Sequence, residues 1–144
     1  MGCLAVVATF AAWAGVPDNP ADLHPIAVGA RAPAFSARMA DGTLRVFSPE
    51  GYQEPTIFLS DSRLEDARAF HIAFHVDDAT LAKQREYGID LETTSGTKQH
   101  ELPVPSVFVI DTPGIVRFVY SNPDFRVRLG ADAWGAAAPF AVVK

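Results

Sequence analysis

The stretch that decides the fold runs from Leu102 to Arg128 and reads LPVPSVFVIDTPGIVRFVYSNPDFRVR. Every side chain from Val107 to Ile110 is apolar, which predicts an interior strand that is covered on both faces. The segment Asp111-Thr112-Pro113-Gly114 follows, and its proline and glycine predict a type II turn. From Gly114 to Tyr120 the side chains alternate, so one face of this second strand tolerates water and the strand lies nearer the sheet edge. The stretch therefore predicts a β-hairpin.

Composition limits what the rest of the chain can be. Its 144 residues, 49% of them hydrophobic and 20% charged, predict one globular domain with one core. The formal net charge is −5 and basic residues do not cluster, so nucleic acid is not expected as a partner. The single cysteine, Cys3, excludes an intrachain disulfide, an iron–sulfur site and any C-x-x-C motif.

The N-terminal segment is uncharged from residue 2 to residue 17. Ala12-Trp13-Ala14 has the A-x-A form read by signal peptidase, which predicts a secretory signal and a periplasmic or secreted protein. Against this, the first basic residue is Arg31, so the basic start of a signal peptide is missing. The alternative is an apolar segment packed on a cytoplasmic domain. The run is too short for a transmembrane helix, and we divide the chain into a leader and linker, 1–25, and a domain, 26–144.

Local signals predict the remaining elements. Asp41-Gly42 between two extended pieces predicts an N-terminal β-hairpin. Ser62-x-x-Glu65 has the form of a capping box, so we expect a helix from Arg63 to Phe74. The other expected elements are an extended linker (Val16 to Pro25), a strand (Thr56 to Leu59), a helix capped by Asp78 and stopped at Gly88, a polar loop (Glu92 to Glu101) and a short helix (Ala131 to Ala138).

Three blocks of this sequence together resemble a known family. They are Val28 to Phe35 (V-G-A-R-A-P-A-F) with Asp41-Gly42, Leu59-Ser60-Asp61 with Ala67 to Phe70, and Leu102 to Arg128. The pattern is similar to peroxiredoxin-like proteins of the alkyl hydroperoxide reductase C / thiol-specific antioxidant family, over about residues 26 to 134. The resemblance implies a thioredoxin-like fold, reduction of hydroperoxides by a thiol, and a thioredoxin-like reductant or another protein as partner.

The family's catalytic segment has no counterpart in this sequence. Its nucleophile lies in a P-x-x-x-[ST]-x-x-C loop, whereas only Ser-Pro-Glu-Gly-Tyr-Gln-Glu-Pro separates Phe47 from Thr56. We therefore expect an α/β protein with a truncated thioredoxin-like fold: a contracted central sheet of three or four strands, flanking helices and the N-terminal hairpin. The strand ending at Leu59 would pair directly with the strand at Val107, or both would leave buried backbone groups unpaired.

The missing segment also decides the expected function. Peroxide reduction needs an activated thiolate, and Cys3 has neither a helix start nor a basic neighbour. We expect a domain without peroxidase activity, without catalytic residues and without a cofactor, whose remaining role is binding or scaffolding through its thioredoxin-type surface. The alternative is that the chain is an internally deleted form of an active thioredoxin-dependent peroxidase. Sequencing the coding DNA around codons 47 to 56 separates the two hypotheses.

Three residues are candidates for a site. By resemblance, Pro105 matches the proline that is usually cis and faces the active cysteine in thioredoxin-like proteins; otherwise it simply begins a strand. His71 and His75 are four residues apart on the predicted helix, a spacing that suits zinc or copper. A third ligand would have to come from Asp77, Asp78, His24 or His100, and the alternative is a solvated histidine pair.

Overall fold

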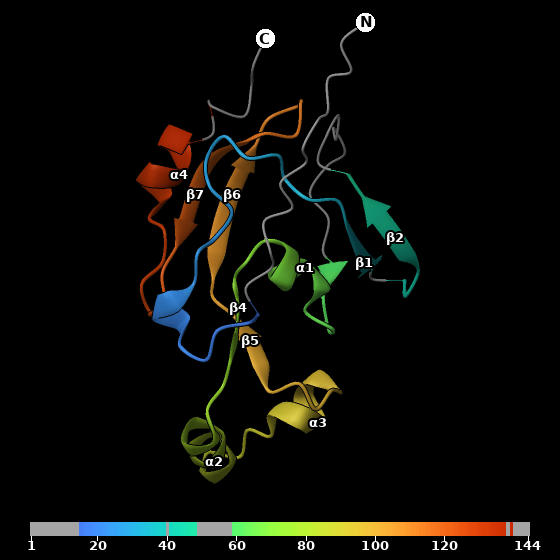
Figure 1. The fold of residues 1–144 in the computed structure, drawn as a ribbon, viewed down its shortest axis with the longest axis vertical. Helices are drawn as coiled ribbons and strands as arrows, with labels where there is room; N and C mark the ends of the chain where they lie inside the picture. The colour runs from blue at the N-terminus through green and yellow to red at the C-terminus, as the bar shows by residue number, and fades with distance from the viewer. Residues whose placement is uncertain (1–14, 40, 49–58, 138, 140–144) are drawn as a thin grey trace, which may run out of the picture.

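The computed structural model describes residues 15–39, 41–48, 59–137 and 139 (Figure 1). Cys3, the predicted leader up to Ala14 and most of the predicted strand from Thr56 lie outside the described residues. The described part is a mixed α/β structure with three small antiparallel sheets, which confirms the expected class. Its elements are η1 (Pro20–Asp22), β1 (Phe35–Met39), β2 (Leu44–Phe47), β3 (Leu59–Ser60), α1 (Glu65–Ala69), β4 (Ala73–His75), α2 (Asp78–Glu86), α3 (Leu91–Ser95), β5 (Glu101–Pro103), β6 (Ser106–Ile110), β7 (Val116–Ser121) and α4 (Ala131–Ala137).

The predicted C-terminal hairpin is present as β6 and β7, with Val109 opposite Phe118. The turn differs from the predicted type. Gly114 N donates to the carbonyl oxygen of Asp111 at 2.8 Å, which makes Pro113 the third residue of the turn and Gly114 the fourth. A type II turn needs a positive φ at the third position, and proline cannot adopt it. The positive φ falls on Gly114 instead, at 83°.

The predicted pairing of β6 with the strand that ends at Leu59 is wrong. Within the described residues β6 pairs with β7 alone, so it is not an interior strand, and of its apolar residues only Val109 is buried, at 7% exposure. β3 pairs with β1 instead, with Met39 opposite Leu59, in a sheet of order β2-β1-β3. The hairpin of β1 and β2, confirmed around Asp41-Gly42, leaves one edge of β1 open, and β3 takes that edge.

The predicted helix from Arg63 to Phe74 is much shorter in the structure. α1 ends at Ala69, and Phe74 belongs to β4, which pairs with β5. The predicted capping box does not form, because the N-cap residue is Leu64 with a left-handed φ of 56° and no side-chain bond. Asp61 instead binds a backbone N–H in the first turn of α1, because its Oδ2 accepts from Ala67 N at 2.9 Å. Sheet pairing has therefore overridden a helical apolar pattern.

The predicted helix at Asp78 is confirmed as α2, with Gly88 in the left-handed region after it. Its cap is the preceding residue, Asp77, whose carboxylate accepts from Thr80 N at 2.8 Å. The predicted helix at Ala131 is confirmed as α4, while Ala138 lies outside the described residues. The predicted polar loop from Glu92 is wrong, because α3 (Leu91–Ser95) has Asp90 as its cap and occupies four of the ten residues of this loop.

The predicted linker from Val16 to Pro25 is not simply extended. It contains the 3₁₀ turn η1, and the carbonyl oxygen of Pro17 accepts from His75 N at 2.8 Å. This bond joins the linker to the edge of β4. Among the described residues, no helix has the length and apolar character that crossing a bilayer requires.

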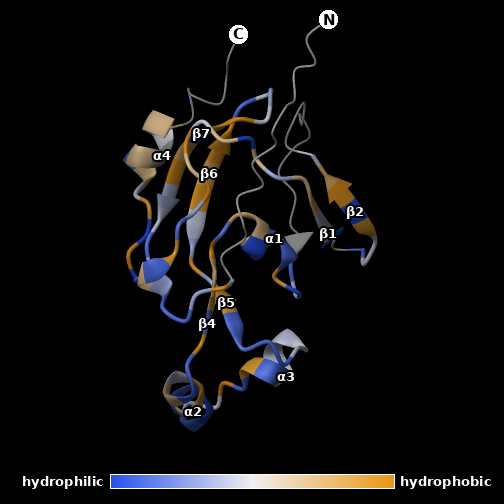
Figure 2. Ribbon diagram, in the orientation of Figure 1, coloured by the Kyte–Doolittle hydropathy of each residue, from blue (hydrophilic) through white to orange (hydrophobic). Residues whose placement is uncertain are grey.

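The core joins the two hairpins through Phe70. Ala32, Phe70 and Val116 form a buried cluster on which Phe35 and Phe108 pack. The ring of Phe70 lies 6.0 Å from that of Phe35 and 4.9 Å from that of Phe108, between centroids. Figure 2 shows apolar residues along β6 and β7 and along β2, on either side of α1. Phe70 thus connects the β1–β2 hairpin to the β6–β7 hairpin.

Candidate functional site

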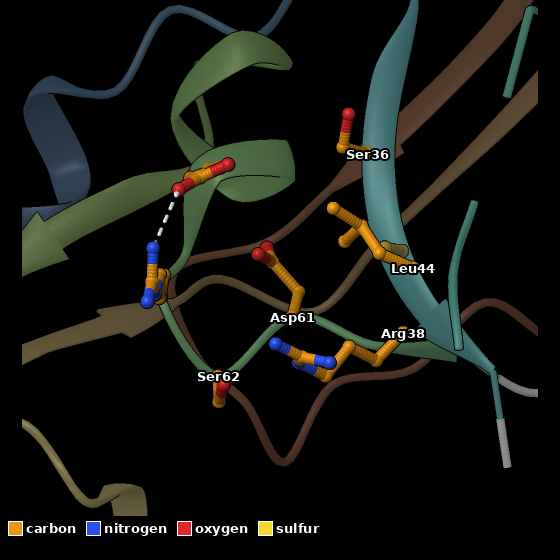
Figure 3. Close-up of a pocket in the computed structure, with 8 residues that line it drawn as sticks. Ser36, Arg38, Leu44, Asp61 and Ser62 are labelled. Atoms are coloured by element: carbon orange, nitrogen blue, oxygen red, sulfur yellow. Dashed lines mark ion pairs between the residues drawn. The ribbon is translucent and has the colours of Figure 1, made fainter. Parts of the chain in front are cut away.

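A cavity of about 210 Å³ lies between the β1–β2 hairpin and the segment that leads into α1 (Figure 3). Ser36 and Arg38 line it from β1, because alternate residues of a strand share a face. Leu44 lines it from β2, where it lies opposite Arg38. Asp61 and Ser62 close the other side, before α1 begins. The cavity is therefore lined both by residues that precede 49–58 in the sequence and by residues that follow them.

The charged groups around this cavity already have partners. Arg38 Nη1 donates to the carbonyl oxygen of Gly42 at 2.9 Å. Asp61 accepts from the backbone of α1, as described above. Arg63 Nη1 lies 4.0 Å from Glu65 Oε1, and both side chains are exposed, so this ion pair contributes little to stability. The hydroxyls of Ser36 and Ser62 are further polar groups in the described lining.

A second cavity of about 250 Å³ adjoins the first and shares Ser36 and Glu65 with it. Phe35 and Val46 give it apolar walls, and Asp66 lines it from α1. Asp66 Oδ1 is buried without a hydrogen-bond partner. Desolvation by burial, followed by the nearby charges of Asp61 and Glu65, raises the pKa of Asp66 to about 6.

Among the described residues, the side chains that line the two cavities include no histidine and no cysteine. A serine becomes a nucleophile only beside a base that removes its proton, and Ser36 and Ser62 have no imidazole among the lining residues. Asp66 can take up or release a proton near pH 6, but it lines the apolar cavity and not the one that contains Ser62.

Pro105 lies between β5 and β6 and lines neither cavity. No peptide bond among the described residues is cis, so the cis bond implied by the resemblance is not found. The next residue, Ser106, begins β6, and its Oγ donates to the carbonyl oxygen of Val104 at 2.9 Å. The geometry agrees with the alternative expectation, in which Pro105 precedes the strand and supplies no ladder donor.

His71 and His75 do not share a helix face, contrary to the prediction. His71 follows α1 in a left-handed conformation with φ of 57°, and His75 is the last residue of β4. Among the described residues, no three histidine, cysteine or acidic side chains come together as a metal site would require. Metal binding by His71 and His75 stays a prediction. The helical spacing that suggested it does not apply, because the two residues are not on one helix.

Sequence reasoning missed an ion cluster at the β4–β5 sheet. The carboxylate of Glu101, which is buried, accepts from Arg68 Nε at 2.9 Å and from Arg68 Nη2 at 2.8 Å. His75 Nε2 lies 3.9 Å from the other oxygen of Glu101, since the two residues are opposite in the sheet. Arg68 lies on α1 and Glu101 on β5, and only the tertiary structure brings them together, so no local motif could have identified the cluster.

A neighbouring pair ties α3 to the same sheet. His100 Nε2 lies 2.6 Å from Glu92 Oε1, and both side chains are about one-third exposed. The backbone carbonyl of His100 accepts from Val76 N at 2.8 Å, which extends the β4–β5 pairing by one step. His100 thus has a structural partner in Glu92.

Replacing Asp66 with asparagine is expected to stabilise the protein at pH 7.5 by about 1 kcal/mol. The raised pKa means that the folded state binds more protons than the unfolded state between pH 3.8 and about 6, so stability is lost as pH rises through this window. Asparagine is neutral and avoids that loss, and solvent screening keeps the gain modest. At pH 4 the variant and the wild type are expected to have similar melting temperatures.

The control for this prediction is Asp22→Asn, at an exposed carboxyl in η1. Thermal unfolding of the three proteins, followed by circular dichroism from pH 4 to pH 8, measures the effect. A wild-type melting temperature that rises steadily between pH 4 and pH 6.5, and a destabilised Asp66→Asn variant at pH 7.5, would contradict the burial of this carboxyl.

No protein-family model matches the sequence, and no curated protein matches it either.

Proposed function

We propose that this chain is a peroxiredoxin-like domain of truncated thioredoxin-like type that has no peroxidase activity and acts by binding. The observation that carries the proposal is the direct pairing of the first and third blocks of the resemblance. Gly29 N donates to the carbonyl of Val116 at 2.8 Å, Val116 N donates to the carbonyl of Ala30 at 2.9 Å, and Ala32 N donates to that of Gly114 at 2.9 Å. Blocks far apart in sequence therefore form one backbone-bonded unit.

The side chains of the same two blocks reinforce this unit. Arg31 Nη1 donates to the carbonyl oxygen of Pro113 at 3.1 Å. The Asp111 carboxylate is almost fully buried, and it accepts from Ile115 N and from Arg117 Nε, both at 2.6 Å. Desolvation opposes ionisation of Asp111, but the bonds from Ile115 and Arg117 outweigh it and lower the pKa of the carboxyl. The residues that carry the resemblance are thus also residues that hold this part of the fold together.

The chemistry of peroxide reduction argues for the inactive form. A thiolate must attack the O–O bond, becoming oxidised as one oxygen leaves with the reduced product. Cys3 is the only sulfhydryl in the chain, and no cysteine lies among the described residues. A chain with one cysteine also cannot form an internal disulfide for a thioredoxin-like reductant to reduce. The proposed role is therefore non-redox binding of a protein partner.

The test is hydrogen peroxide consumption by the purified chain in the presence of dithiothreitol. The expected result is that the wild type and a Cys3→Ser variant both consume peroxide at the rate of buffer alone. Consumption by the wild type that is lost in Cys3→Ser would overturn the proposal and make Cys3 the nucleophile. Consumption that survives in Cys3→Ser would overturn it as well, since the chemistry would then need no thiol.

A further inference from the structure

β2 forms the outer edge of the three-stranded sheet (Figure 1). Within the described residues no strand pairs with the side of β2 that faces away from β1. The strand is apolar at this edge, because the side chains of Leu44 and Val46 are 65% and 70% exposed, and Figure 2 shows it as a hydrophobic strand at the margin of the structure. An exposed apolar edge strand is a ready template for another strand.

The backbone of β2 presents its free groups at the same two residues. Met39 N donates to the carbonyl oxygen of Thr43 at 2.9 Å, which makes these two residues a hydrogen-bonded pair. Such pairs alternate along an antiparallel ladder, so Arg45 and its partner Ala37 form the next one. The N–H and C=O groups of Leu44 and Val46 must then point away from β1. They lie in position to bond a further strand.

A second copy of β2 fits this edge in one register better than in another. If the two-fold axis passed through Arg45, the two guanidinium groups would lie opposite each other, and like charges in that position are destabilising. If the axis passes through Val46, Arg45 lies opposite Phe47 of the partner subunit. Arg45 already lies with its guanidinium carbon 5.6 Å from the centroid of its own Phe47 ring and keeps that contact, and the two guanidinium groups no longer lie opposite each other.

We propose that two copies of this chain associate through β2, antiparallel and with the two-fold axis at Val46. The outward backbone groups of Val46 then bond to their own equivalents across the axis, and those of Leu44 bond to Ser48 of the partner subunit. The side chains of Leu44 and Val46 from both copies lie on one face of the extended sheet, where each covers apolar surface of the other. This inference stands on the geometry of β2 and does not depend on the family resemblance.

The first test is sedimentation equilibrium of the wild type and of Val46→Lys over a range of protein concentrations. The wild type is expected to dimerise reversibly, whereas Val46→Lys is expected to stay monomeric because two ammonium groups would meet at the axis. The side chain of Val46 is mostly exposed, so the far-UV circular dichroism of the variant should not change. Val28→Lys, at a side chain that is 60% exposed and lies outside β2, is the matched control and should dimerise like the wild type.

The second test fixes the register by cross-linking in a Cys3→Ser background. The Cα atoms of a hydrogen-bonded pair are about 5.5 Å apart, which is within the range of a disulfide, so Val46→Cys should form a covalent dimer on mild oxidation. Leu44→Cys should not, because the two introduced thiols would be separated by four residues along the strands, roughly 14 Å.

Each of three results would overturn the proposal: a wild type that is monomeric at all concentrations, a Val46→Lys variant that still dimerises, or a cross-link that forms at Leu44 and not at Val46. Dimerisation lost in Val46→Lys and kept in Val28→Lys, with a cross-link at Val46 alone, supports it. Peroxide consumption has no bearing on this outcome, so this proposal and the proposed function fail independently.

Discussion

Replacing Phe70 with alanine is expected to lower the free energy of unfolding by about 3–5 kcal/mol, as for other large-to-small substitutions of core aromatics. The Phe70 ring is buried at the junction of the two hairpins, in contact with Phe35 on one side and Phe108 on the other. Its removal leaves a cavity and also removes two aromatic contacts, each favourable beyond the burial of area. Because a small domain is only marginally stable, the variant should be largely unfolded at 37 °C.

Urea denaturation followed by circular dichroism measures this effect, with Phe125→Ala as the control. Phe125 is 64% exposed, so its truncation should change stability by less than about 0.5 kcal/mol. If Phe70→Ala and Phe125→Ala were equally stable, the two hairpins would not be joined through the Phe70 ring, and the core described above would be wrong.

Replacing Arg68 with alanine is expected to cost about 3 kcal/mol. The side chains of Arg68 and Glu101 are 18% and 7% exposed, so the change leaves a buried carboxylate without its main partner. His75, 3.9 Å from Glu101 and 42% exposed, is too distant to replace the two short bonds from Arg68. The loss should fall on the β4–β5 sheet, to which Glu101 belongs.

A double variant separates two quantities: the net contribution of the Arg68–Glu101 ion pair to the free energy of unfolding, and the cost of removing only one of the two charges. Arg68→Met with Glu101→Leu removes both charges and keeps apolar bulk, and its stability is expected to lie within about 1 kcal/mol of the wild type. Urea denaturation of the two single variants and the double variant gives the coupling energy. Single variants that were no less stable than the double variant would show that Glu101 is not buried with its charge, contrary to the structure.

The candidate site could be predicted from the sequence only in part. The sequence alone shows that the family's cysteine loop has no counterpart, because only eight residues separate Phe47 from Thr56. The cavity at Ser36 and Ser62 was not predicted, because it forms only when β1 and the start of α1 come together. His71 and His75 were predicted as a pair because they are four residues apart on a predicted helix. In the structure α1 ends at Ala69, so neither histidine lies on that helix.

The sequence by itself determined the features that act over a few residues. Asp41-Gly42 and the segment from Asp111 to Gly114 each form a hairpin, and α2 ends where Gly88 takes a positive φ, because turn residues restrict the backbone wherever they occur. The tertiary structure alone decided that β3 pairs with β1, and that the segment around Phe74 is a strand. These choices depend on which strand edges and apolar groups meet in space. The free energy of strand pairing and burial comes from contacts between residues far apart in the chain, so no local sequence pattern predicts it.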